Sequence, residues 1–172
     1  MNGDYLRVAS TRGTIIHLYR DGTLLAAVPI DRNNLAWSDK TDRALHPLAM
    51  IEFVTSALLF FQTVLADLVV PPPEVFIELD LAHMQHNAQP VQLPAGGITG
   101  NYGFWGPRGD APNSNWHTHL TVPMQAFDPP SAAYLLIREV YAWFGHTEED
   151  IPYTEGAGDD RKISITAIQG MG

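Results

Sequence analysis

Two histidines one residue apart are the side chains best suited to chemistry in this sequence. His117 and His119 lie in the alternating segment WHTHLTV. Side chains two positions apart on a β-strand point to the same face, so both imidazoles could bind one metal ion. A third ligand would come from the end of a neighbouring predicted strand: His83, His86 or Asp80. One interpretation of the pattern is a metal-dependent hydrolase, with zinc as the metal. The simpler interpretation, which we favour, is two exposed histidines on the solvated face of an amphipathic strand.

Other catalytic motifs are incomplete. The chain contains no cysteine, which excludes disulfides, thiolate–metal sites and a cysteine nucleophile. It has no Gly-x-Ser-x-Gly motif that would position a nucleophilic serine. The segment His119-Leu120-Thr121 matches one half of a two-histidine phosphoesterase, but the sequence has no second His-x-Ser/Thr motif. We therefore favour a protein without catalytic activity and without a cofactor.

A long segment without periodicity, residues 85–115, separates two predicted strands. It contains three aromatic residues and one cation that could contact a ligand or partner: Tyr102, Phe104, Trp105 and Arg108. Loops of this length inside a compact domain are uncommon and are often functional. Residues 94–115 could close over a small-ligand site or contact a partner. The alternative, which we favour, is a loop anchored to the core by its aromatic side chains.

The chain is acidic. Its 172 residues include 10 Lys+Arg and 19 Asp+Glu, for a formal net charge of −9. Phosphate contacts require clustered basic side chains, and the basic residues here are scattered, so direct nucleic-acid binding is disfavoured. The first residues, MNGDYLRVAS, lack the charged-then-apolar pattern of a signal peptide, and we expect a cytoplasmic protein.

The segment from His46 to Val70 is strongly apolar and predicts one long helix. Its LLFF run extends the apolar surface most of the way round, and three prolines follow it. Such a helix must be covered by protein or lipid. Only residues 53–66 lie between the charges of Glu52 and Asp67, which is shorter than the roughly 20 residues of a membrane span. We expect a central core helix rather than a membrane helix; the alternative is that one side docks on a partner.

The remaining pattern is mostly β-strand. Asp21-Gly22 between two β-favouring runs predicts a hairpin with a tight primed turn. Asp128 followed by two prolines predicts the start of a second helix, which Gly145 ends. Alternating segments predict four further strands, over residues 5–9, 75–81, 116–122 and 162–168. We expect one globular domain over residues 1–172 with an α+β fold. A mostly antiparallel or mixed sheet would carry one long apolar central helix and a second, shorter helix packed on it.

Three segments also resemble a known family region. The segments RGTIIHLYRDGTLLAAVPI, LHPLAMIEFVTSALLFF and VVPPPEVFIELDL resemble the region that follows the Schlafen-type AlbA_2 domain in some large bacterial ATP-binding or DNA-binding proteins. The late segment WFGHTEEDIPYTEGAG is loosely similar to their aromatic, glycine-containing and acidic tail. The AlbA_2 domain itself, with its acidic–Lys and Asn–Gly–Gly features, is absent, so no catalytic residue carries over. The resemblance implies an accessory domain for sensing or assembly.

The sequence therefore predicts a non-catalytic accessory or interaction domain, part of a larger bacterial effector. We expect it to bind a protein partner, or to self-associate, through an apolar patch. Two alternatives remain open. One is a metal-dependent hydrolase that uses His117 and His119, and the other is a small-ligand-binding domain closed by residues 94–115.

Overall fold

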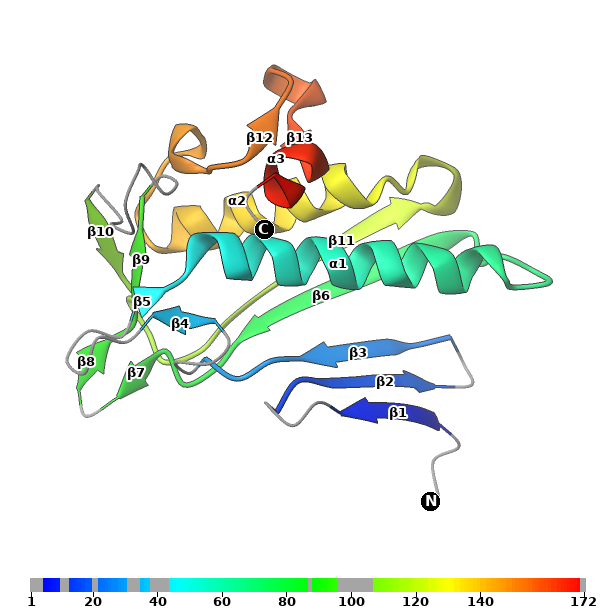
Figure 1. The fold of residues 1–172 in the computed structure, drawn as a ribbon, viewed down its shortest axis with the longest axis horizontal. Helices are drawn as coiled ribbons and strands as arrows, with labels where there is room; N and C mark the ends of the chain where they lie inside the picture. Colours follow the sequence, from blue (N-terminus) through cyan, green and yellow to red (C-terminus); the bar gives the residue numbers. More distant parts are fainter. Residues whose placement is uncertain are drawn as a thin grey trace.

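Two long helices form the centre of the molecule. The computed structural model describes residues 5–9, 13–19, 22–30, 35–37, 44–86, 88–95 and 107–170. Helix α1 (Pro47–Ala66) and helix α2 (Pro129–Trp143) pack against each other, and α2 also contacts strands β11 (Trp116–Pro123) and β13 (Lys162–Ile163) (Figure 1). The predicted α+β class, with one long apolar helix and a second helix packed on it, is confirmed.

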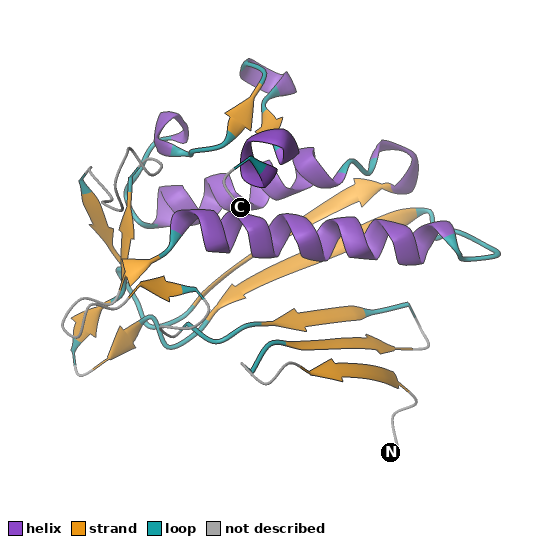
Figure 2. Cartoon of the chain, viewed as in Figure 1, coloured by secondary structure: helices purple, strands orange, loops and turns teal. Residues whose placement is uncertain are grey.

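The strands form several small sheets around the helices (Figure 2). An N-terminal antiparallel sheet has the order β1 (Tyr5–Ala9), β2 (Ile15–Tyr19), β3 (Leu24–Ala27). Strand β6 (Glu74–Leu81) pairs with β11 along its whole length, from Glu74 opposite Pro123 to Leu81 opposite Trp116. A four-stranded sheet has the order β10 (Arg108–Asp110), β9 (Gln92–Pro94), β5 (Ala44–Leu45), β4 (Ala36–Trp37). Two short antiparallel pairs complete the set: β7 (Gln85–His86) with β8 (Gln89–Pro90), and β12 (Thr154–Glu155) with β13.

Prolines near both ends of helix α1 favour its start and limit how far it can extend. Pro47 occupies the first turn, where its missing N–H breaks no helical hydrogen bond. The helix ends at Ala66 with Asp67 as C-cap. The prediction of a helix up to Val70 is therefore wrong for residues 67–70. Proline disfavours the helical conformation of the residue before it, so the helix could not continue through Val70 into Pro71.

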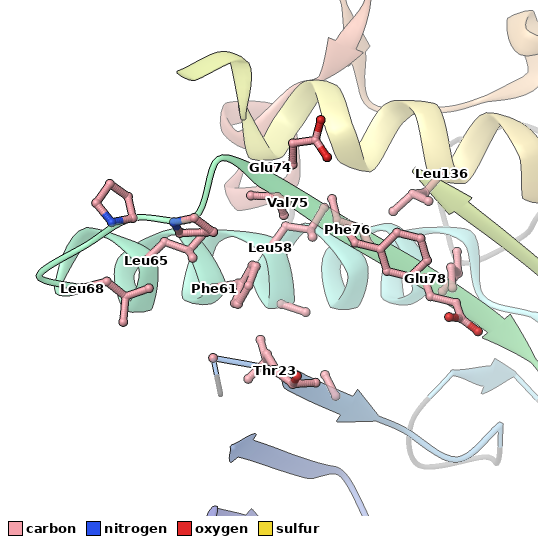
Figure 3. A pocket seen from close by; sticks show the side chains of 18 of the residues that line it. Thr23, Leu58, Phe61, Leu65, Leu68, Glu74, Val75, Phe76, Glu78 and Leu136 are labelled. Carbon is pink, nitrogen blue, oxygen red and sulfur yellow. The ribbon is translucent and has the colours of Figure 1, made fainter. Parts of the chain in front are cut away.

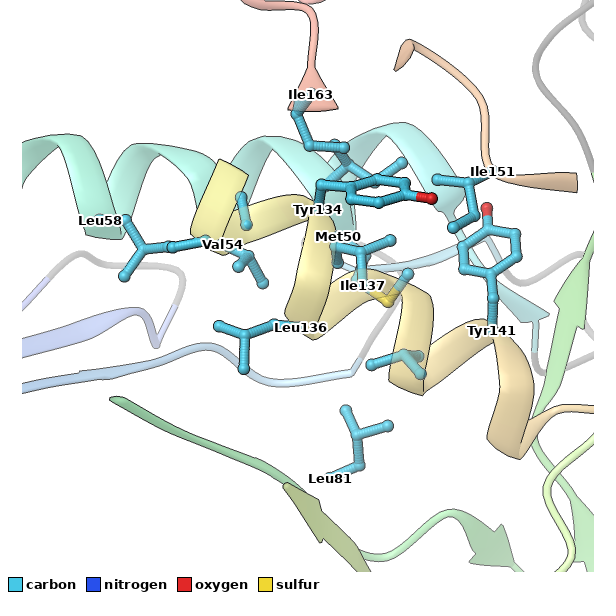
Figure 4. Packing of buried hydrophobic residues seen from close by; sticks show 14 of the residues in the cluster. Met50, Val54, Leu58, Leu81, Tyr134, Leu136, Ile137, Tyr141, Ile151 and Ile163 are labelled. Atoms are coloured by element: carbon cyan, nitrogen blue, oxygen red, sulfur yellow. The ribbon is translucent and has the colours of Figure 1, made fainter. Parts of the chain in front are cut away.

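One face of α1 supplies much of the core. Met50, Val54 and Leu58 of α1 lie against Leu136 and Ile137 of α2 (Figure 4). The same cluster includes side chains from β6, from the end of β13 and from the segment after α2: Leu81, Ile163 and Ile151. Because burial of such side chains stabilises a fold by about 1.5–3 kcal/mol each, this contact fixes how α1 and α2 lie relative to each other.

The predicted hairpin is confirmed, but its turn differs from the expected one. Gly22 N–H donates to the Tyr19 carbonyl (3.1 Å), and Tyr19 N–H donates to the Thr23 carbonyl (2.9 Å). These bonds close a three-residue loop with glycine at the position of positive φ (+87°), rather than a two-residue primed turn.

The last predicted strand, residues 162–168, is wrong beyond its first two residues. Strand β13 ends at Ile163, and α3 (Ile165–Gln169) follows. The Ser164 side chain accepts a hydrogen bond from Ala167 N–H (3.4 Å), and this cap starts a helix that alternation alone does not reveal.

The described parts of residues 85–115 contain more regular structure than predicted. Strands β7 to β10 lie within this segment, with three 3₁₀ turns elsewhere: η1 (Met124–Ala126), η2 (Glu148–Asp150) and η3 (Gly158–Asp160). Strands of two or three residues are too short to produce a detectable alternation, so they were missed.

The N-cap of α2 provides a test of the local structure. Asp128 Oδ2 accepts hydrogen bonds from Ser131 N–H (3.1 Å) and from Ser131 Oγ (2.6 Å). We expect Asp128→Ala to lower the free energy of unfolding by about 1 kcal/mol, because these acceptors are lost. Asp128→Asn keeps an acceptor and should retain most of the stability. Equal losses in both variants, measured by urea denaturation, would contradict the capping role.

The N-cap of α1 predicts a pH dependence of stability. His46 Nδ1 accepts from Ala49 N–H (3.2 Å), and partial burial lowers the pKa of His46. The unfolded chain therefore takes up the His46 proton at a higher pH than the folded chain. The stability that the fold gains from neutral His46 is complete above the unfolded-state pKa. It is lost as the pH falls through the range between the unfolded-state and folded-state pKa values. We expect the free energy of unfolding to decrease as the pH falls below the ordinary histidine pKa of 6.5. His46→Asn, which keeps a capping oxygen but cannot titrate, should flatten this profile; an unchanged slope would contradict the assignment.

Candidate binding groove

A groove separates the N-terminal hairpin from α1 and β6. Its volume is about 780 Å³, and its lining comes from β3, one side of α1, the segment after α1, and β6. Figure 3 shows Leu58, Phe61 and Leu65 of α1 on one side and Thr23 of the hairpin on the other.

The groove uses a second face of α1. Met50 belongs to the buried face alone, and Val54 and Leu58 are buried but also line the groove. Phe53 and Phe61 line the groove and are only partly buried. A helix that is apolar most of the way round thus covers one face with α2 and leaves a neighbouring apolar face at the groove. The sequence indicated this through the LLFF run, without indicating which side would stay uncovered.

The rim of the groove exposes large apolar side chains. Of the lining residues, Val70 is 79% exposed and Phe76 is 61% exposed; the adjacent Val69 is 99% exposed. Val69 and Val70 lie between the end of α1 and the three prolines, so neither a helix nor a strand covers them. Single exposed apolar residues are common, but several around one apolar hollow are typical of an interaction site.

The described lining of the groove carries only negative charge. Among the described lining residues, the charged side chains are Glu74 and Glu78, both exposed on β6. They share the face of β6 that points away from the helices, with Phe76 between them, because side chains alternate along a strand. The groove therefore combines an apolar floor with an acidic edge.

The predicted pair of histidines lies near this acidic edge. His117 and His119 are exposed and share one face of β11, as expected. His117 is directly opposite Asp80 on β6, and His119 is opposite Glu78. The His119 ring stacks on Phe76, with 5.7 Å between ring centroids and 30° between planes. The two imidazoles thus pair with carboxylate positions across the strands.

A complete metal site is not found in the described part of the chain, where no group of three or more His, Asp or Glu side chains is placed to hold an ion. His83 is exposed, has φ +59°, and donates its backbone N–H to Asn115 Oδ1 (3.2 Å). His86 lies in β7, and its side chain is outside the described residues. The metal hypothesis stays a prediction that depends on His86.

Of the aromatic loop, residues 94–115, the structure describes residues 94–95 and 107–115. Tyr102, Phe104 and Trp105 lie outside the described residues. The described lining of the groove includes no residue from 94–115. Arg108 Nη1 donates to Gln92 Oε1 (3.2 Å), which links β10 to β9.

His146, just after α2, connects β9 and β10 to the end of this helix. No sequence motif indicated this role. His146 Nε2 lies 2.7 Å from the Leu93 carbonyl oxygen and 3.2 Å from Gly109 N. One nitrogen cannot donate to the first and accept from the second, and the shorter contact favours a proton on Nε2 that is donated to Leu93. A side chain at position 109 would collide with the Phe144 carbonyl, which explains the glycine there.

Helix α1 also meets the length and composition of a membrane span, alone among the described helices, and 33% of its apolar window is buried. One such helix is weak evidence, because core helices of globular domains have the same properties. The packing of α1 on α2 accounts for its buried face without lipid.

The exposure of the rim predicts that two nearby valines contribute differently to the free energy of unfolding. We expect Val70→Ser to change the free energy of unfolding by less than about 0.5 kcal/mol, because Val70 already contacts water. Val75, only 3% exposed, should lose more than about 2 kcal/mol as Val75→Ser, through lost packing and a buried hydroxyl. Chemical denaturation of both variants checks this. A large loss for Val70→Ser would mean that the rim serves folding rather than binding.

Comparisons with known proteins do not assign this chain to a family. No protein-family model, no curated protein and no solved structure matches it. The resemblance to the region after the AlbA_2 domain therefore stays a prediction. The groove and its lining are the features on which a functional proposal can rest.

Proposed function

We propose that this protein is a non-catalytic interaction domain that binds an apolar segment of a partner protein in the groove between β3, α1 and β6. The observation that carries the proposal is the exposed apolar rim, Val69, Val70 and Phe76, around an apolar hollow of about 780 Å³. Covering these side chains would remove apolar surface from water, at about 25 cal/mol per Å².

The composition of the groove supports binding of a peptide segment. Its floor is apolar, including Leu58, Leu65 and Val75, and its two carboxylates lie at one edge. An apolar centre with polar groups at the margin is the usual anatomy of a protein–protein contact. The exposed valines extend this surface beyond the hollow itself, towards the end of α1.

A small apolar molecule is a second candidate ligand. A volume of about 780 Å³ lies within the range of small-molecule sites, about 300–1,000 Å³. A small ligand inside the hollow would leave Val69, which is not a lining residue, in water. The peptide proposal accounts for this side chain and is therefore preferred.

Selection of peptides from a random linear library tests the proposal. Ala57 lines the groove, and Ala57→Trp should block it. Ser56→Trp adds the same side chain at an adjacent exposed position that does not line the groove, and it serves as the control. We expect selected peptides to bind wild type and Ser56→Trp alike and Ala57→Trp at least about tenfold more weakly, a difference of about 1.4 kcal/mol.

Cooperative urea unfolding of both tryptophan variants must first establish that each is folded. Peptides that bind all three proteins equally would contradict the proposal. Failure to select any peptide, together with groove-dependent binding of an apolar dye, would favour the small-molecule alternative instead.

A further inference from the structure

We infer that the groove is a vacant strand position, which a basic, apolar segment of a partner protein fills by pairing in extended form between β3 and β6. The inference rests on the proposed function and specifies its ligand. It draws on the connectivity of β3 and β6, their free edges, and the charges on β6.

Strands β3 and β6 are the two ends of one crossover connection. They run in the same direction (Figure 1), and the connection between them contains β4, β5 and α1. Parallel strands joined by a connection that includes a helix commonly lie in one sheet. Within the described chain, however, β3 pairs with β2 alone and β6 with β11 alone. The groove lies between them, where the sheet is interrupted.

No described strand pairs with the outer edge of β3. Tyr19 N–H bonds to the Thr23 carbonyl, so Thr23 is a hydrogen-bonded position of the β2–β3 ladder. Hydrogen-bonded positions alternate in an antiparallel pair, so the backbone groups of Leu24 and Ala26 point away from β2. Both residues line the groove. The strand LLAA carries no proline, lysine or other charge that would protect an edge from pairing.

The groove also runs along the edge of β6. Its lining includes every residue from Glu74 to Leu79. Side chains alternate between the two faces of a strand, so a groove on one face would contact every second residue. Contact with six consecutive positions identifies the side of the strand, which is where a new strand would pair.

The lining specifies the sequence of the incoming strand. Glu74, Phe76 and Glu78 share one face of β6, so cross-strand neighbours would be a cation, a β-branched or aromatic residue, and a second cation. The intervening residues would face the apolar side chains of α1, Phe53 and Phe61. This pattern is Lys/Arg, apolar, β-branched, apolar, Lys/Arg. A second copy of this chain is disfavoured as the occupant, because both copies carry a net charge of −9.

The probe is a fluorescein-labelled peptide with the core Lys-Val-Thr-Val-Lys between Gly-Ser flanks, and its binding is measured by fluorescence anisotropy. We expect it to bind wild type. Replacing both lysines by glutamate should weaken binding by about tenfold or more. Glu74→Lys with Glu78→Lys should do the same to the lysine peptide. Asp80→Lys, on the same face of β6 but outside the groove lining, is the matched control and should have a smaller effect.

Backbone methylation separates strand pairing from other binding. N-methylation of alternate residues blocks the N–H groups on one edge of the peptide without changing its charge. We expect both alternate patterns to reduce binding strongly, because one edge faces β3 and the other faces β6. Hydrogen exchange should also slow at the amides of Leu24 and Ala26 when the peptide binds.

The possible results distinguish this inference from the proposed function. Equal binding of methylated and unmethylated peptides, or no change in exchange at Leu24 and Ala26, would overturn strand pairing while leaving a peptide-binding groove. Absence of binding by the lysine peptide, with groove-dependent binding of library peptides, would overturn the basic pattern alone. If neither the designed nor any library peptide binds through the groove, the proposed function fails as well.

Discussion

The contact between α1 and α2 is the constraint on which the rest of the structure depends. Met50, Val54 and Leu58 of α1 are buried in it, and β6 adds Leu81 to the same cluster. Once this face is fixed, the rotation of α1 about its axis is fixed too. Phe53 and Phe61 must then point to the neighbouring side, where the hairpin lies. The groove is therefore a geometric consequence of core packing on a helix with more apolar surface than its own chain covers.

The long elements could be predicted from the sequence because each carries its own signal. Helix α1 has a proline at its start and prolines after its end, β6 and β11 alternate over eight residues each, and α2 has an aspartate cap. The signals fail where an element is short or where two interpretations share one pattern. Residues 162–168 alternate as a strand would, yet Ser164 caps a helix. Strands such as β7 and β8 have two residues, too few to show any period.

Less of the candidate site than of the fold could be predicted from the sequence. The shared face of His117 and His119 follows from strand geometry, but their opposite residues, Asp80 and Glu78, depend on the register of β6 and β11. That register is a long-range property that no local pattern encodes. The groove likewise lies between elements distant in sequence. The sequence indicated only its cause, an excess of apolar surface on the central helix.

The three prolines after α1 have a consequence beyond ending the helix. Proline has no backbone N–H, so a chain that pairs along the free edge of β6 finds no backbone donor at the three positions before Glu74. The chain is also held at this point, since Met124 N–H donates to the Pro73 carbonyl (3.0 Å). The prolines thus mark the N-terminal limit of the part of the β6 edge that can donate hydrogen bonds. The register of a chain that pairs there is set relative to this limit. A shift of one residue would turn its charges from Glu74 and Glu78 towards the apolar side chains of α1.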